Sequence, residues 1–137
     1  MMPATALRLG NLVATADQPE HPDFVLMLEP CLVHLLQETL FREEHDIVGV
    51  PIDAATLHRY GIPHREWFPV GKRRVYLSVI HPRGLTQLHV GPQLHRVRWM
   101  HEIQNLIFDV TGEHLITHPH IHQPFQKTGD AGTQRAD

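Results

Sequence analysis

Residues 75–90 read VYLSVIHPRGLTQLHV, two alternating apolar segments on either side of a short polar break. In a strand over 75–80, Val75, Leu77 and Val79 fall on one face, because successive side chains point to opposite faces. The break at 81–84 contains proline and glycine, which favour a turn, and residues 85–90 return as the partner strand. The stretch therefore predicts an antiparallel hairpin.

In the C-terminal part of the chain, apolar residues recur at the three- and four-residue spacing of a helix instead of alternating. From about His95 to Thr111 apolar residues recur on one helix face, and Gly112 is a typical residue to end such a helix. A shorter helix is predicted over 54–60, because Asp53 is a good N-cap residue and Gly61 follows. The apolar residues of the longer helix are Trp99, Ile103, Leu106, Ile107 and Val110.

The N-terminal part predicts further short strands. Residues 7–13 alternate and then break at Gly10-Asn11, a pattern similar to the opening strand of small SH3-like barrels. Segment 31–41 fits a helix or a strand with a turn near Glu38, and we favour the strand. The other segments are a polar loop over 16–23, a buried strand over 24–28 and a strand over 47–52.

Together these elements predict an α+β fold: a small, strongly bent antiparallel sheet or an SH3-like barrel with the C-terminal helix packed on it. A chain of 137 residues has the size of one domain. We expect a single globular domain over 1–123 and a flexible polar tail over 124–137. The apolar stretches are too short to cross a membrane, so the expected location is the cytoplasm.

Charge is distributed unevenly along the chain. Residues 1–58 hold nine carboxylates against two arginines, whereas residues 59–98 hold eight cations against one carboxylate. Seven of those eight cations are arginine, which is well suited to bidentate binding of phosphate or carboxylate. The alternative is that the two segments face each other within the fold or across a homo-oligomer.

Three stretches carry a resemblance: LRLGN at 7–11, VPIDAATL at 50–57 followed by Tyr60-Gly61-Ile62, and HEIQNLIFDVTGEHL at 101–115. In this order they resemble a group of small proteins from Bacteroidetes-type genomes, mobile elements and phages. That group pairs an LRIGN opening with a terminal HQLQNLYFALTGEEL. This chain departs from it at Glu102 and Asp109. The resemblance implies kinship and a phage-like context, without a particular activity.

A candidate ligand site combines cations with the polar edge of the last helix. Backbone N–H groups at a helix start favour anions, and amide and imidazole groups could read the polar edge of a nucleobase. The alternative is that the amide side chains of this helix only bond loop backbone. The predicted ligand-binding residues are Arg73, Arg74, Arg96, Arg98, His101, Gln104 and Asn105.

Metal binding and catalysis have weaker support. In an extended strand His118, His120 and His122 would project to one face, where a divalent metal could be held, but a nearby carboxylate is missing. Cys31 lies among apolar neighbours, and Ser78 lacks a nucleophile-elbow motif. We therefore expect no cofactor and favour a protein without enzymatic activity over an enzyme.

The preferred function is binding of an anionic, nucleotide-like small molecule, with sequestration of a host defence signal as its purpose in a phage context. The near-neutral pI of about 6.5 speaks against nucleic acid as the partner. One alternative is a protein–protein interaction module that uses the acidic N-terminal half, including Glu43 and Glu44. The other is a metal-dependent hydrolase that uses the histidines.

Overall fold

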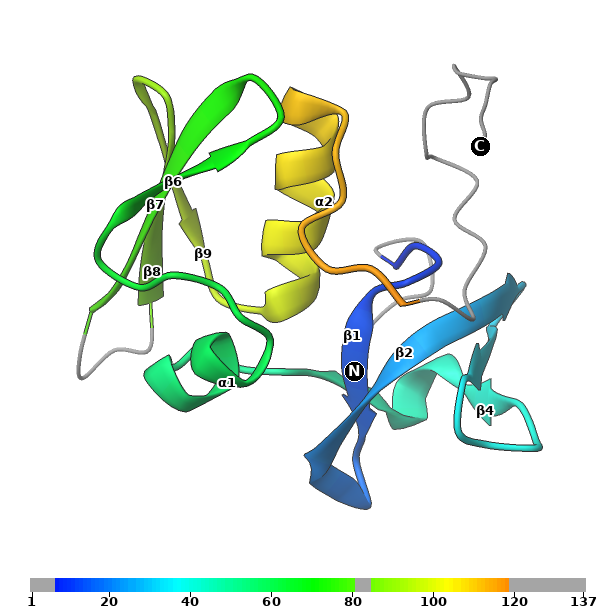
Figure 1. Ribbon diagram of the computed structural model, residues 1–137. Coiled ribbons are helices and arrows are strands. Elements are labelled where there is room, and N and C mark those ends of the chain that lie inside the picture. The colour runs from blue at the N-terminus through cyan, green and yellow to red at the C-terminus, as the bar shows by residue number, and fades with distance from the viewer. Residues whose placement is uncertain (1–6, 81–84, 119–137) are drawn as a thin grey trace.

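Two antiparallel sheets and two α-helices make up the computed structural model, which describes residues 7–80 and 85–118 (Figure 1). The first sheet has the strand order β4-β3-β2-β1-β5. Its strands are β1 (Leu12–Thr15), β2 (Gln18–Glu29), β3 (Leu32–Leu35), β4 (Arg42–Glu43) and β5 (Ile47–Gly49), with a 3-10 turn at Glu44–Asp46 between the last two.

The second sheet has the order β6-β7-β8-β9, so each strand pairs with its neighbour in the chain. Its central hairpin pairs Ile80 with Leu85 and Val75 with Val90, the register that the alternating sequence predicts. The strands are β6 (Trp67–Val70), β7 (Arg73–Ile80), β8 (Leu85–Val90) and β9 (Gln93–Val97).

Both helices follow from local sequence signals. In α1 (Ala54–Arg59) the Asp53 carboxylate accepts a hydrogen bond from the Thr56 N–H at 2.8 Å, the cap that the sequence predicts. The longer α2 (Met100–Thr111) ends at Gly112, whose φ of 78° is a left-handed conformation that glycine adopts without strain. Figure 1 shows α2 standing between the two sheets.

The α+β class is confirmed, whereas the SH3-like barrel or single bent sheet is not. The strands belong to two separate sheets, and neither of them closes. The segment that contains α1 separates β5 from β6 along the chain, and α2 packs against both β1 and β8. Each sheet can therefore cover its apolar face without curling into a barrel.

Several boundaries differ from the sequence prediction, and β5 ends at Gly49 rather than at Ile52. The first strand begins only at Leu12, after a turn at Gly10 with φ of 86°. Segment 16–23 is mostly strand, because Thr15 pairs with Gln18 across a tight turn and the prolines of β2 lie in its exposed beginning. Residues 95–97 belong to β9, so the last helix starts five residues later than predicted.

Other predictions in the N-terminal part are confirmed. Segment 31–41 contains a strand, β3, rather than a helix, and segment 24–28 is a strand within β2, although Val25 alone of its residues is buried and Met27 is exposed. Pro30 and Cys31 form the turn between β2 and β3, with Cys31 at φ of 65°. The predicted turn over 81–84 and tail over 124–137 lie outside the described residues.

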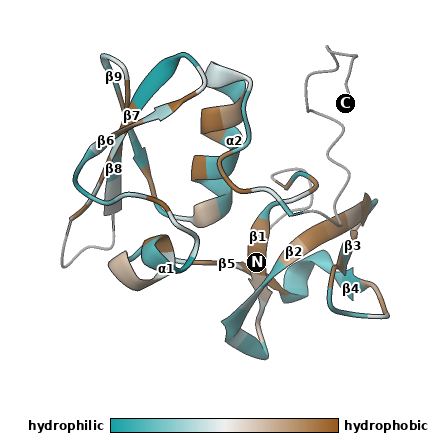
Figure 2. Cartoon of the chain, viewed as in Figure 1, coloured by the Kyte–Doolittle hydropathy of each residue, from teal (hydrophilic) through white to brown (hydrophobic). Residues whose placement is uncertain are grey.

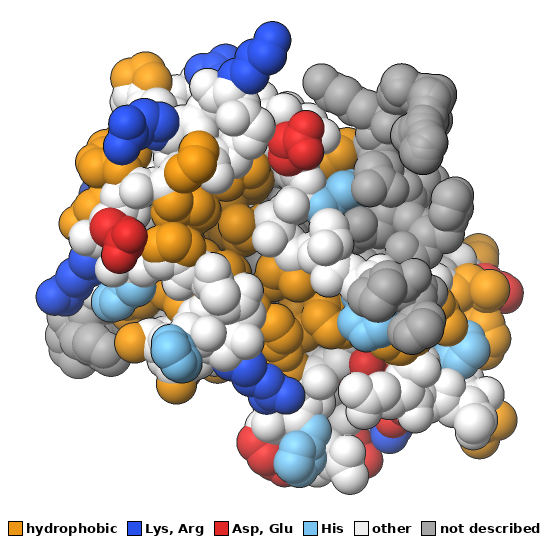
Figure 3. Space-filling model, in the orientation of Figure 1, with side chains coloured by type: hydrophobic (Ala, Val, Ile, Leu, Met, Phe, Trp, Pro, Cys, Tyr) orange, Lys and Arg blue, Asp and Glu red, His pale blue; other side chains and the backbone are white. Residues whose placement is uncertain are grey.

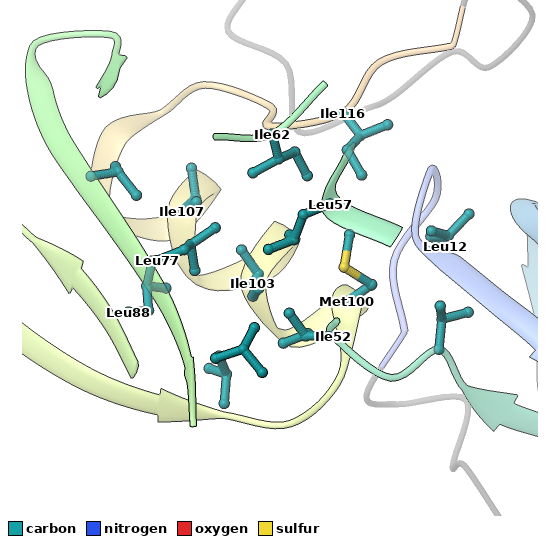
Figure 4. Packing of buried hydrophobic residues seen from close by; sticks show 14 of the residues in the cluster. Leu12, Ile52, Leu57, Ile62, Leu77, Leu88, Met100, Ile103, Ile107 and Ile116 are labelled. Carbon is teal, nitrogen blue, oxygen red and sulfur yellow. The ribbon is translucent and has the colours of Figure 1, made fainter. Parts of the chain in front are cut away.

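The main core lies between the second sheet, α1 and α2. Ile103 and Ile107 of α2 lie beside Leu77 and Leu88 of the sheet, and all four side chains are fully buried (Figure 4). The ribbon of α2 alternates between hydrophobic and hydrophilic segments, as an amphipathic helix should (Figure 2). A second, smaller cluster fills the first sheet and consists of Leu7, Val13, Val25, Val33, Leu35 and Ile47.

Backbone hydrogen bonding and close packing connect the segment after β5 to the start of α2. The Met100 N–H donates to the Val50 carbonyl at 2.9 Å, and Pro51 forms an isolated bridge with Trp99. At Gly49 a Cβ would lie 2.5 Å from Cδ2 of Trp99, so the indole packs directly on this backbone. The glycine therefore permits the close approach that holds the two parts together.

Candidate functional site

The polar edge of α2 is used inside the protein. Gln104 is buried, its amide donates to the Gly10 carbonyl at 2.9 Å, and its Oε1 accepts from the Leu12 N–H at 2.7 Å. Beside it the Asn11 amide donates to Oδ1 of Asn105 at 2.8 Å. These bonds hold the start of β1 against α2, which is the structural alternative that the sequence left open.

His101 is also a packed residue. Its side chain is buried, and its Nδ1 has no hydrogen-bond partner among the described residues. Burial lowers the pKa of His101, while the neighbouring Glu102 carboxylate raises it to a smaller extent. The imidazole is therefore neutral at pH 7, and it does not contribute charge to a surface site.

The four predicted arginines do not meet this edge of α2. Arg73 and Arg74 lie on β7, Arg96 on β9 and Arg98 in the link to α2, and all are exposed. Strand alternation places Arg74 and Arg96 on the face of the second sheet that is turned away from α2, opposite the buried residues. Arg98 instead lies over the Trp99 ring, 5.9 Å from its centre.

Aromatic side chains occupy the middle of this outward face. Trp67 and Tyr76 are directly paired across β6 and β7, and their ring centres are 5.4 Å apart. Tyr76 is paired in turn with His89 of β8, at 5.9 Å, and the ring of Trp67 lies 6.1 Å from that of His89. With Leu94 of β9 opposite His89, one row of apolar and aromatic groups crosses all four strands.

This row stays accessible to solvent. Trp67 is 44% exposed and Leu94 is 47% exposed, although large apolar side chains are usually buried more deeply. Exposed rings in a cluster stabilise a sheet through cross-strand contacts, but they also offer flat apolar surface to a ligand. We define the outer face as the solvent-facing residues of β6–β9: Trp67, Pro69, Arg74, Tyr76, Ser78, Gln87, His89, Leu94 and Arg96.

The charged residues of β6–β9 are all cations, although exposed Glu66 directly precedes β6 and the Glu113 side chain lies against Gly71. The sequence from Trp67 to Arg98 contains six cations and no carboxylate. None of the ion pairs between described residues includes Lys72, Arg73, Arg74 or Arg96. In Figure 3 most of the Lys and Arg side chains lie over the part of the molecule that holds β6–β9. These guanidinium groups are thus not neutralised by the acidic N-terminal half.

A shallow depression lies between Trp67 and the neighbouring cations. It has a volume of about 430 Å³ and is lined by Trp67, Lys72, Arg73, Arg74 and Gly91. The indole can stack on a flat ring of a ligand, while the three cationic side chains beside it neutralise an anionic group of the same ligand. The depression therefore places Trp67 of the outer face next to cationic side chains at the edge of the second sheet.

Sequence reasoning found only part of the outer face. It identified Arg74 and Arg96 as ligand-binding residues, but its candidate set did not include Trp67, Tyr76, His89 or Leu94. The hairpin register was sufficient to place His89 opposite Tyr76, because pairing Ile80 with Leu85 fixes every other pair. Leu94 could not be placed without β9.

Metal binding gains no support from the described residues, where no group of three His, Cys, Asp or Glu side chains could hold an ion. His118 instead packs its ring 5.2 Å from that of Phe24. His120 and His122 lie outside the described residues.

Comparisons with known proteins do not add to this picture: no protein-family model, curated protein or solved structure matches the chain. Neither helix in the described part of the chain has the length and apolarity that a membrane-spanning helix requires.

Two histidines give the fold a pH dependence, of which His101 is buried and His114 is half-buried. Burial lowers the pKa of His101 and of His114 below the ordinary value of 6.5, so the unfolded chain binds more protons than the folded one in mildly acidic solution. Above pH 6.5 both histidines are neutral in the folded and in the unfolded chain, and the free energy of unfolding is not reduced. As the pH falls through and below 6.5, protonation favours the unfolded chain and the free energy of unfolding decreases. We expect the urea midpoint to decrease from pH 7.5 to pH 5.

The variant His101→Leu should reduce this decrease, whereas replacing the exposed His58 with Gln should leave it as in the wild type. A urea midpoint that is unchanged or higher at pH 5 would contradict the burial argument.

Proposed function

We propose that the outer face binds an anionic ligand with a flat ring, such as a nucleotide, and that the protein acts by binding without a covalent step. The observation that carries this proposal is the cluster of Trp67, Tyr76 and His89 beside arginines that have no ion-pair partner among the described residues. The rings supply stacking, and the guanidinium groups supply charge-assisted hydrogen bonds to phosphate.

The depression suggests how one nucleotide would bind. Its base would lie against the exposed part of Trp67, and its phosphate would meet Arg74 together with Lys72 or Arg73. This site replaces the combination of arginines with the polar edge of α2, because that edge holds β1. In the phage-like context that the sequence resemblance implies, such a protein would sequester a nucleotide signal of host defence.

The test is a titration of the protein with AMP, ATP and cyclic mononucleotides, followed by tryptophan fluorescence and thermal shift. We expect binding that raises the melting temperature, because a ligand that binds only the folded state stabilises it. Trp67→Ala and Arg74→Ala should each weaken binding about tenfold, which corresponds to roughly 1.4 kcal/mol.

Arg59→Ala is the matched control, because Arg59 is an exposed arginine on α1, away from the outer face. Its affinity should equal that of the wild type. The proposal is wrong if no mononucleotide at millimolar concentration changes the fluorescence or the melting temperature, or if Arg59→Ala weakens binding as much as Arg74→Ala does.

A further inference from the structure

Cations flank the aromatic row of the outer face on both sides. Arg74 precedes Tyr76 by two residues on β7, so it lies on the same face one row away. On the other side of the row, Arg96 of β9 pairs with Gln87 of β8, and Gln87 pairs with Ser78 of β7. The row of Arg74 and the row of Arg96 are thus four residues apart along the strands, or about 13 Å.

From this arrangement we infer that the natural ligand is a single-stranded nucleic acid, an inference that rests on the proposed function and names its ligand class. A mononucleotide carries its phosphate on one side of the base, so it can use the cations on one side of the row only. A nucleic-acid strand carries a phosphate on both sides of each base. It would therefore bind Arg74 and Arg96 at the same time. Stacking on Trp67 and Tyr76 tolerates any base, because every base has a flat face.

The shape of the site favours a single-stranded nucleic acid over a small molecule as the ligand. Small-molecule sites are usually concave and bury most of the ligand, whereas the aromatic row lies on an open sheet face with Trp67 and Leu94 nearly half exposed. A duplex fits less well, because its bases already stack on each other and offer no free face to the rings. Half-buried Ser78 and Gln87, beside Arg96, could bond the edge of an unstacked base.

The near-neutral pI is compatible with nucleic-acid binding because the acidic and basic residues lie in different parts of the chain. The carboxylates that offset the arginines belong mainly to residues 1–58, which include all five strands of the first sheet, and the segment from Trp67 to Arg98 has none. At physiological ionic strength, charges interact over only about 8 Å, so a strand on the outer face meets the local cations. The acidic first sheet would repel the same strand and confine it to the second sheet.

The experiment measures fluorescence anisotropy of labelled oligo-dT and oligo-rU of 4, 8 and 12 nucleotides, with dTMP, UMP and a 12-base-pair duplex as competitors. We expect the 8-mer to bind at least 100-fold more tightly than the mononucleotides and more tightly than the duplex. Arg74→Ala and Arg96→Ala should each weaken oligonucleotide binding about tenfold. Each should also reduce the slope of log K against log salt by about 0.7, the value for one phosphate contact on a single strand.

Arg96→Ala separates this inference from the proposed function. It should weaken the oligonucleotide and leave mononucleotide affinity unchanged, whereas Arg74→Ala should weaken both ligands and Arg59→Ala neither. If mononucleotides bind as tightly as oligonucleotides and Arg96→Ala has no effect, the inference is wrong and the proposed function stands. If neither class binds, both are wrong, and a duplex that binds as tightly as the single strand overturns the stacking argument.

Discussion

Replacing Gln104 with Ala is expected to lower the free energy of unfolding by about 2–6 kcal/mol. The substitution leaves the Leu12 N–H and the Gly10 carbonyl without their partners in a buried place. Each buried group that loses its partner costs about 1–3 kcal/mol. Urea unfolding followed by circular dichroism measures the change.

The variant Gln104→Glu tests separately whether the hydrogen bond to the Gly10 carbonyl is needed. A carboxylate can still accept from the Leu12 N–H, but it cannot donate to the Gly10 carbonyl, and its charge would be buried. The protonated carboxyl can make both bonds. Since burial raises the pKa of such a group, the stability that Gln104→Glu loses relative to the wild type should be largest at pH 8 and smallest near pH 5.

The matched control is Gln18→Ala, because Gln18 is an exposed glutamine at the start of β2 and should change stability by less than about 0.5 kcal/mol. A loss below about 1 kcal/mol in Gln104→Ala would show that the two bonds do not hold β1 on α2. A loss in Gln104→Glu that is the same at every pH would show that the donor to Gly10 is not needed.

Gln104 also shows where sequence reasoning reaches its limit. Its partners lie more than 90 positions away, at Gly10 in the turn before β1 and at Leu12, the first residue of β1. Helical spacing correctly places Gln104 beside the apolar stripe, but it cannot tell whether the neighbouring element is solvent, ligand or another segment of the chain. The polar edge of α2 was therefore interpreted as a ligand surface, although it faces Gly10 and Leu12.

Local signals did predict several elements. The alternation of β7 and β8 fixes their faces and register, and Asp53 and Gly112 fix the start of α1 and the end of α2. The start of α2 was misplaced because its N-cap is Trp99, a residue without a capping oxygen. Glu102 accepts the Trp99 and Arg98 N–H groups from inside the helix instead.

The two missed strands of the second sheet explain why the outer face could not be assembled in advance. β6 is four residues long and contains Pro69, which usually argues against a strand. It is an edge strand, where a proline is tolerated. Residues 95–97 of β9 fall at the start of the helix that the sequence predicts over about 95–111. Without these strands, Trp67 and Arg96 could not be placed on one surface.

Replacing Ile103 with Ala should also lower the free energy of unfolding by about 2–5 kcal/mol, the usual cost of emptying a fully buried isoleucine site. Ile103 lies in the core cluster that joins residues of both sheets and of both helices, and Figure 4 shows it among Met100, Ile52 and Ile107. Ile103→Val is the matched control, with an expected loss of about 0.5–1.5 kcal/mol. Urea unfolding measures both losses.

The same variant tests whether the two sheets unfold together. Because α2 packs on β8 with one face and is bonded to the start of β1 through Gln104, a cavity at Ile103 should weaken both sheets. Hydrogen exchange should therefore show the amides of β2 and β7 losing protection by a similar factor in Ile103→Ala. If only β7 loses protection, the first sheet folds without the core around α2, and the small cluster of Val13, Val25 and Val33 is sufficient to hold it.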